Sequence, residues 1–274
     1  MRRLLGIAAL IASGGAYGAH APGTVDKLWR LDCGTIHVEQ LNAFSDTQSY
    51  PGQSRDLVSS CYLIKDGDAY MVWDTGIAPS IRDAPADPSD PETPGLRKTI
   101  VEQLAELGLR ADQIGLIGIS HYHYDHSGQA AAFPKAKLVI GAEDLAVARR
   151  RPAVGKPIAP WLADGAKVEG IEGDKDLFGD GSVVMIALPG HTPGHHGLLV
   201  RLPKTGAVLL SGDVAHFREN LDSDGVPTFN TDRADSLAAM DRFRKLAHSL
   251  KAVAIIQHDP RDVAKLPAFP QGAE

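Results

Sequence analysis

The chain has 274 residues, a length that suits one large domain or two small ones. Hydrophobic residues make up 43% of the chain and charged residues 23%, which excludes a disordered chain and a collagen-like repeat. The net charge is −6, and the longest basic run is Arg149-Arg150-Arg151, so nucleic acid is not expected as a partner.

The N-terminus has the pattern of a secretory signal. Arg2 and Arg3 precede a short apolar run over residues 4–12, and small residues favour cleavage near 18–21. The run is too short to span a bilayer as a mature helix, so we expect residues 1–20 to be a signal peptide and residues 25–274 to form a single domain. Its removal gives a net charge of −6 − 2 = −8 and a periplasmic or secreted protein with no membrane span. An uncleaved anchor or a lipid-free N-terminal tail is the alternative.

Export to an oxidising compartment affects whether the two cysteines are expected to form a disulfide. Cys33 and Cys61 both lie in strand-like segments and could pair in an oxidising compartment. A sequence does not show whether their Cα atoms are close enough for a bond, so we expect two buried free thiols.

The first half of the chain predicts strands, loops and one helix. Residues 27–39 alternate like a strand, and residues 59–74 predict a hairpin whose Asp66-Gly67 turn suits a positive φ. A polar loop over 42–56 carries Phe44 and Tyr50. Five prolines within 79–95 predict a surface loop, which could serve as a lid, and 96–109 has the apolar spacing of an amphipathic helix.

The second half alternates strands and helices. Strands are predicted over 114–120, 137–140, 183–188, 198–202, 207–210 and 252–256. Helices are predicted near 129–133, over 142–150, and after an N-cap at Thr231 or Asp232. A second long surface loop over 151–165 contains Trp161. This order of elements predicts a β-sandwich covered by helices.

A dense cluster of metal-binding side chains follows the apolar strand 114–120. His121, His123, Asp125 and His126 lie within six residues, at the end of what reads as a strand buried on both faces. Neutral imidazole nitrogens and carboxylate oxygens are the ligands that a borderline divalent cation such as zinc prefers. The cluster therefore predicts part of a metal site.

Three further residues occur in the same context. His191, Asp213 and His258 each follow a predicted buried strand through a short turn. A lone histidine at a strand end is more often a hydrogen-bonded core or surface residue. The repetition of one context along the chain favours a shared site instead.

These motifs resemble the signature of the metallo-β-lactamase fold superfamily. The matching segments are His121-Tyr122-His123-Tyr124-Asp125-His126, Pro189-Gly190-His191-Thr192-Pro193-Gly194-His195, Ser211-Gly212-Asp213 and His258. The resemblance implies an α/β (α+β) fold, a four-layer αββα sandwich with a dinuclear metal site at one edge. It assigns His121, His123 and His191 to one metal, Asp125, His126 and His258 to the other, and Asp213 to both.

The resemblance also implies supporting roles and cofactors. Asp74 would accept a hydrogen bond from a liganding imidazole, with a turn residue as the alternative, and His195 would lie just outside the ligands. Two Zn²⁺ ions per chain are expected, with iron, cobalt or manganese as alternatives. Two cations about 3.5–4 Å apart lower the pKa of a shared water and polarise a carbonyl. Asp125 would then give a proton to the leaving oxygen, or act only as a ligand.

Further segments resemble the N-acyl-homoserine lactonase family, whose members quench quorum signals. They are Leu31-Asp32-Cys33-Gly34, Ser60-Cys61-Tyr62-Leu63-Ile64, and residues 211–220. One departure is His216, which stands where several of these lactonases have a tyrosine that contacts the substrate carbonyl. A histidine can donate a similar hydrogen bond, and a plain loop residue is the alternative.

The expected enzyme is thus a zinc-dependent carboxylic-ester hydrolase that opens the lactone ring of N-acyl-homoserine lactones. Candidates for contact with the acyl tail are Phe44, Tyr50, Trp161 and Phe217, although each could equally be ordinary loop packing. The alternatives are a hydrolase of the same fold acting on another lactone, an ester or a β-lactam, and a non-hydrolytic metal-binding or redox protein. The expected partner is a small-molecule lactone, and a homodimer is left open.

Overall fold

A computed structural model describes residues 23–82, 84 and 90–274. The predicted signal peptide over 1–20, and residues 83 and 85–89 of the predicted loop over 79–95, lie outside the described residues. No helix within the described ranges combines the length and the apolar character needed to cross a membrane.

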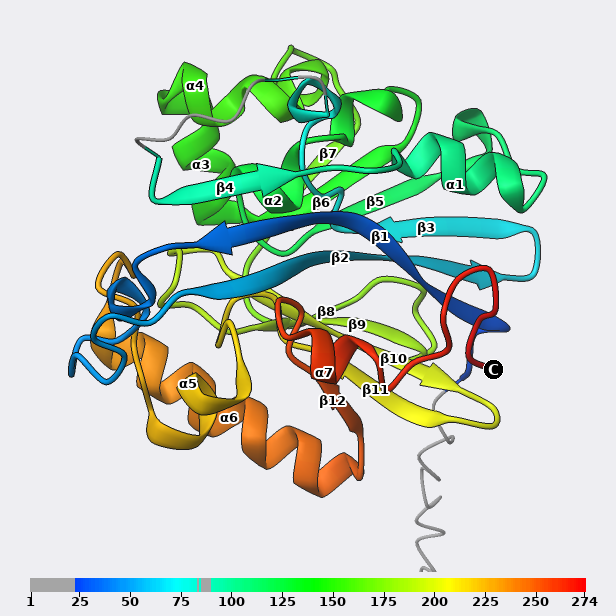
Figure 1. Ribbon diagram of the computed structural model, residues 1–274. Coiled ribbons are helices and arrows are strands. Elements are labelled where there is room, and N and C mark those ends of the chain that lie inside the picture. Colours follow the sequence, from blue (N-terminus) through cyan, green and yellow to red (C-terminus); the bar gives the residue numbers. More distant parts are fainter. Residues whose placement is uncertain (1–22, 83, 85–89) are drawn as a thin grey trace, which may run out of the picture.

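Two sheets form the centre of the molecule (Figure 1). The first has seven strands in the order β4-β1-β2-β3-β5-β6-β7, and the second has five in the order β12-β11-β10-β9-β8. The first sheet consists of β1 (Lys27–Val38), β2 (Arg55–Asp66), β3 (Ala69–Trp73), β4 (Glu92–Gly95), β5 (Leu116–Ile119), β6 (Lys137–Gly141) and β7 (Val168–Ile171). The second consists of β8 (Lys175–Asp176), β9 (Val183–Ala187), β10 (His196–Leu202), β11 (Gly206–Leu210) and β12 (Val253–Ile255).

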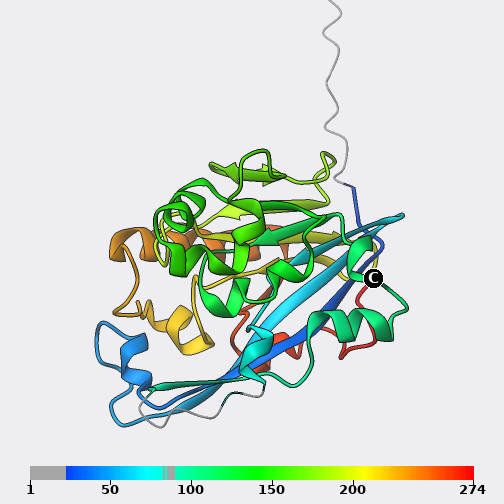
Figure 2. The ribbon, with the colours of Figure 1, turned by 90° about the horizontal axis from the view of Figure 1, so that it is seen from above.

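Helices cover the two outer faces (Figures 1 and 2). Those above the first sheet are α1 (Ile100–Glu106), α2 (Tyr124–Ser127), α3 (Ala142–Arg150) and α4 (Pro152–Gly155). Those on the side of the second sheet are α5 (Arg218–Ser223) and α6 (Arg233–Leu250), while the short α7 (Pro260–Val263) packs against β12 and β2 at the side of the sandwich. The layers run helix, sheet, sheet, helix, and the predicted αββα fold class is confirmed.

Side-chain alternation along the strands explains why both faces of each sheet are covered. In β2, Leu63 packs under the helices above the first sheet, while its neighbour Ile64 packs between the two sheets. In β11, Leu210 points between the sheets and Leu209 packs against α6. A strand that is apolar on both faces needs cover on both, which the helical layers provide.

The sequence-based prediction of free thiols is wrong, because Cys33 and Cys61 form a disulfide with a Cα–Cα distance of 5.8 Å. Strands β1 and β2 are antiparallel neighbours in which Leu31 lies opposite Cys61. Cys33 lies two residues after Leu31 on the same face of β1, which makes it a diagonal neighbour of Cys61. Strand register is a long-range property, so the spacing of the cysteines along the chain could not reveal it.

The predicted loop over 79–95 contains an additional strand. Strand β4 pairs antiparallel with β1, with Pro94 opposite Ile36. A proline lacks the N–H of a ladder bond, but β4 lies at the sheet edge, where only one side needs partners. The end of this segment therefore forms part of the sheet rather than a free loop.

Two other predicted boundaries differ from those observed. The helix expected over 96–109 begins later, at Ile100, because Thr99 and Glu102 form a reciprocal capping box at its start. The loop expected over 151–165 contains α4 and the 3₁₀ segment Lys156–Trp161. Pro152 favours the start of α4, because a first-turn residue needs no intrahelical N–H bond.

Candidate metal centre

The metal-binding side chains leave from the ends of strands at one edge of the sandwich. Strands β9 and β11 are both antiparallel to β10, and β12 is parallel to β11, so β9, β11 and β12 run in the same direction. The turns after their ends carry His191, Asp213 and His258. The turn after β5 and the following helix α2 bring the remaining ligand candidates to the same edge from the first sheet.

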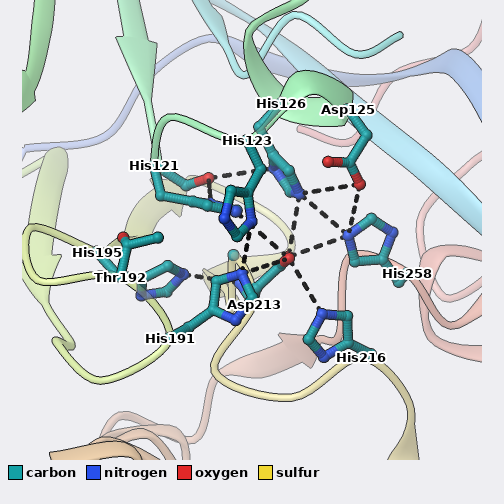
Figure 3. Close-up of polar contacts among 12 residues, drawn as sticks. His121, His123, Asp125, His126, His191, Thr192, His195, Asp213, His216 and His258 are labelled. Atoms are coloured by element: carbon teal, nitrogen blue, oxygen red, sulfur yellow. Dashed lines mark hydrogen bonds and ion pairs between the residues drawn. The ribbon is translucent and has the colours of Figure 1, made fainter. Parts of the chain in front are cut away.

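The structure brings all the predicted ligands together in two groups. Their donor atoms lie within 4.8 Å of one another in each group: His121, His123, His191 and Asp213 in the first, and Asp125, His126 and His258 in the second. Figure 3 shows both groups converging on Asp213.

The Asp213 carboxylate stands between the two groups. Its Oδ2 lies 3.5 Å from His121 Nε2 and 3.3 Å from His191 Nε2. Its Oδ1 lies 3.1 Å from His126 Nε2 and 3.0 Å from His258 Nε2. One oxygen thus faces each group, which is the arrangement needed for a carboxylate to bridge two cations.

Hydrogen bonds on the outer side of the imidazoles orient their inner nitrogens. His126 Nδ1 donates to Asp74 Oδ2 at 2.9 Å, and His258 Nδ1 donates to the Val58 carbonyl at 2.7 Å. His191 Nδ1 donates to Asn230 Oδ1 at 2.8 Å. A proton on Nδ1 leaves a lone pair on Nε2, and in all three rings Nε2 points to the centre.

The inner nitrogens fit a cation better than they fit one another. His126 Nε2 lies 3.0 Å from His258 Nε2, and His191 Nε2 lies 2.9 Å from His123 Nδ1. His121 Nε2 is buried and has no hydrogen-bond partner among the described residues. Imidazole lone pairs that face each other at this distance repel, unless a proton or a metal cation lies between them. The nitrogen and oxygen donors present are those that zinc takes.

Burial and charge act together in this centre. Burial lowers the pKa of His121 and His191 well below the usual histidine range, so both rings are neutral and able to bind a metal. Burial opposes a charge on His126, but Asp213, Asp125 and Asp74 outweigh it and raise its pKa well above the usual range. The carboxylates thus make this centre favourable for positive charge.

Asp74 is part of a buried network that joins both sheets. Its Oδ1 accepts the Ser120 N–H at 2.7 Å, and its Oδ2 accepts a second hydrogen bond, from Gln257 Nε2, at 2.9 Å. Gln257 Oε1 accepts Trp73 Nε1–H at 3.1 Å and the Gly212 N–H at 2.8 Å. Sequence reasoning placed Asp74 here but missed Gln257, for which its position directly before His258 was the only signal.

His195 supports the backbone of Asp213. Its Nε2 accepts the Asp213 N–H at 2.7 Å, and its Nδ1 donates to the Leu188 carbonyl at 2.9 Å. Burial lowers the pKa of His195 to about 3, which keeps Nε2 unprotonated as an acceptor. The residue therefore lies where the prediction put it, directly outside the ligand candidates.

His216 lies at the mouth of the centre. Its Nε2 is 3.2 Å from Asp213 Oδ2, and its ring stacks on His258 at 5.4 Å with an interplanar angle of 10°. Phe44 packs edge-on against the same ring at 4.8 Å. Its Nδ1 is buried and finds no hydrogen-bond partner in the part of the chain that the structure describes. These contacts hold the ring beside the space where a substrate would meet the metals.

A cavity of about 200 Å³ opens above the centre. His216 and Asp125 line it, together with an apolar wall formed by Ile36, Phe44, Leu57 and Phe229. Glu92, Tyr124 and the ligand candidates His123, His191, Asp213 and His258 complete the lining. Apart from His216 and the ligand candidates, sequence reasoning identified only Phe44 among these residues; Tyr124 lies inside the histidine motif, and the sequence carries no signal for the others.

The other predicted tail contacts lie elsewhere. Tyr50 and Phe217 pack on each other at 5.3 Å in the core cluster behind the cavity. The predicted contact of Trp161 with the acyl tail is corrected by its position. The side chain is buried in the core beneath the helices of the first sheet, where its Nε1–H donates to the Ala136 carbonyl at 2.9 Å. A tryptophan in a proline-rich segment resembles an exposed loop residue, but here it anchors that segment to the core.

Comparison with known proteins adds relatives in sequence. Residues 54–258 match the Metallo-beta-lactamase superfamily. An N-acyl homoserine lactonase, AttM, of Azorhizobium caulinodans is 29% identical over 170 residues, which cover 58% of this chain and 64% of that relative. The N-acyl homoserine lactonase AiiA of Bacillus thuringiensis subsp. kurstaki is 27% identical over 256 residues, covering 90% of this chain and 99% of the relative.

Solved structures share the fold. An N-acyl homoserine lactone hydrolase, with the product N-hexanoyl-L-homoserine bound at its catalytic metal centre, superposes with a TM-score of 0.80 at 24% identity. The superposition covers 92% of this chain and 100% of that chain. AidC, a dizinc quorum-quenching lactonase, superposes with a TM-score of 0.65 at 20% identity, covering 91% and 92%.

Proposed function

The chain belongs to the metallo-beta-lactamase superfamily, and on that premise we propose that it is a metal-dependent hydrolase that opens the lactone ring of N-acyl homoserine lactones. The observation that carries the proposal is the pair of histidine and carboxylate groups with the Asp213 carboxylate between them. Relatives named as N-acyl homoserine lactonases, one aligned along 90% of the chain, support the choice of substrate.

The proposed cofactor is two zinc ions, with iron, cobalt or manganese as alternatives. His121, His123 and His191 would hold one ion, Asp125, His126 and His258 the other, and Asp213 both. When bound, such ions lower the pKa of a water between them and polarise the lactone carbonyl.

The residues of the chain itself orient the substrate and move the proton. Asp125 lines the cavity, so its carboxylate is placed to take the proton that the attacking water loses and to pass it to the ring oxygen as the carbon–oxygen bond breaks. His216 lies on the other side of the cavity floor and would donate a hydrogen bond to the lactone carbonyl. Asp74 and His195 hold His126 and Asp213 in position for these steps.

The cavity wall favours an uncharged substrate with an apolar tail. Phe44 and Phe229 give it aromatic surface against which an acyl chain can pack. No lysine or arginine among the described residues lines the cavity, so a carboxylate-bearing substrate such as a β-lactam has no basic partner there. This difference favours a neutral lactone over a β-lactam.

We also propose that the protein works outside the cytoplasm. In this proposal residues 1–20 are a signal peptide, and residues 25–274 form the catalytic domain in the periplasm or outside the cell. The disulfide between Cys33 and Cys61 supports it, because such bonds persist in oxidising compartments.

The direct test is a panel of substrates with the zinc-loaded protein. N-acyl homoserine lactones of several chain lengths are assayed beside a simple γ-lactone, an aryl ester and a β-lactam. We expect the acylated lactones to have the highest kcat/KM. Preferred turnover of the ester or the β-lactam would contradict the proposed substrate, and bound metal without turnover of any compound would contradict hydrolysis.

A further inference from the structure

Glu92 is a carboxylate in the cavity wall that belongs to neither metal-binding group. It is the first residue of β4, where its pairing with Val38 of β1 fixes its position at the sheet edge. It lines the same cavity as Asp125, Phe44 and Phe229. Glu92 is half-buried beside the aromatic and aliphatic part of this lining, and partial burial of a carboxylate is unfavourable.

The contacts of Glu92 leave much of its acceptor capacity open to the cavity. The Tyr124 hydroxyl donates to Oε2 at 3.4 Å, a long hydrogen bond. Within the described ranges this is the only hydrogen bond to the carboxylate, and no lysine or arginine shares the cavity lining. A carboxylate offers about four lone-pair sites, so most remain available to a donor on a ligand.

A ligand donor would stabilise the Glu92 carboxylate in its surroundings. Burial raises the pKa of the Glu92 carboxyl group, and the neighbouring Asp125 adds to this shift. Both effects destabilise the negative charge in the free cavity. A ligand N–H that reaches the carboxylate compensates that cost, whereas a methylene or an ether oxygen does not.

We propose that Glu92 determines specificity by accepting the N–H of an acylamino group on the carbon next to the lactone carbonyl. This deepens the proposed function and rests on it. In this proposal the ring lies beside Asp125 and His216 and the acyl chain against Phe44 and Phe229, so that the substituent nitrogen shares the cavity that Glu92 also lines. The residue thus selects N-acylamino lactones over lactones that lack the N–H.

The test compares two substrates in four proteins. The substrates are N-hexanoyl homoserine lactone and its analogue in which a methylene replaces the amide N–H. The proteins are the wild type, Glu92→Leu, Glu92→Gln, and the control Glu39→Gln, which removes an exposed carboxylate just beyond β1. Leucine removes the acceptor, whereas glutamine keeps a neutral carbonyl acceptor of the same length.

We expect the wild type to prefer the N–H substrate in kcat/KM, and Glu92→Leu to reduce that preference about tenfold. The preference of Glu92→Gln for the N–H substrate should lie between those of the wild type and Glu92→Leu. The preference of Glu39→Gln should match that of the wild type. Bound zinc and circular dichroism should be unchanged in all variants, which separates lost selectivity from lost structure.

A wild-type preference retained in Glu92→Leu would overturn the role of Glu92 while leaving lactone hydrolysis intact. If the leucine variant does not fold, the glutamine variant decides, and an unchanged preference in it overturns the role. A wild type that opens neither lactone would instead overturn the proposed function, and the role of Glu92 with it.

Discussion

Replacing Asp74 by asparagine tests how the metal centre is held together. Asp74 is fully buried, accepts the His126 Nδ1–H at 2.9 Å and accepts the Ser120 N–H at 2.7 Å. Asparagine has nearly the same shape but no charge and only one acceptor oxygen. The variant therefore weakens the bond that orients His126 and leaves the surrounding packing in place.

The structure allows the size of the effect to be worked out. A hydrogen bond to a charged group contributes about 1.5–3 kcal/mol. At about 1.4 kcal/mol for each factor of ten, losing this bond weakens cation binding by His126 and its group about 10- to 150-fold. Asp74 contacts none of the side chains of the His121 group among the described residues and is linked to them through Ser120 and Gln257, so the affinity of that group should fall less.

The assay is a competition titration of zinc between the protein and a chromophoric chelator. A matched control is Asp68→Asn, the same chemical change in the exposed turn between β2 and β3. We expect Asp74→Asn to bind one of its two zinc ions more weakly than the wild type does. The control should bind both ions with wild-type affinity. Zinc affinities within twofold of the wild type would refute the role assigned to Asp74.

Three further variants test other parts of the account. Replacing Cys33 and Cys61 by alanine opens a loop with a sequence separation of 28 and should lower the free energy of unfolding by about 3.6 kcal/mol, as measured by urea denaturation; equal stability would show that the bond is not formed in solution. Asp213→Ala should release bound zinc and abolish turnover, and a fully active variant would refute its bridging position. His216→Phe should lower kcat/KM at least tenfold with unchanged zinc content. Phenylalanine keeps the stacking on His258 but cannot donate a hydrogen bond to the substrate. A normal kcat/KM would show that His216 is only a packing residue.

The position of the metal centre could be predicted because its residues follow strong local signals. His191, Asp213 and His258 each come directly after an apolar strand, and the strand length fixes where the chain turns. The family resemblance then grouped residues that lie far apart in the sequence. The αββα layers follow from the same strands, since a strand apolar on both faces must be covered on both.

Other features depend on long-range register and could not be predicted. The pairing of Cys33 with Cys61 follows from the register of β1 against β2, which no local pattern encodes. Glu92 reaches the cavity only because β4 adds to the sheet edge, and Phe229 reaches it from a segment without periodicity. Trp161 was misplaced because prolines indicate a loop but do not show which side chains it buries.

The most direct test of the central proposal is a zinc titration of the metal-free protein, with opening of N-hexanoyl homoserine lactone as the readout. The two groups joined by Asp213 predict that activity rises until two equivalents of zinc are bound per chain and then stays constant. Full activity at one equivalent, or zinc binding at both groups without ring opening, would contradict a two-metal lactonase.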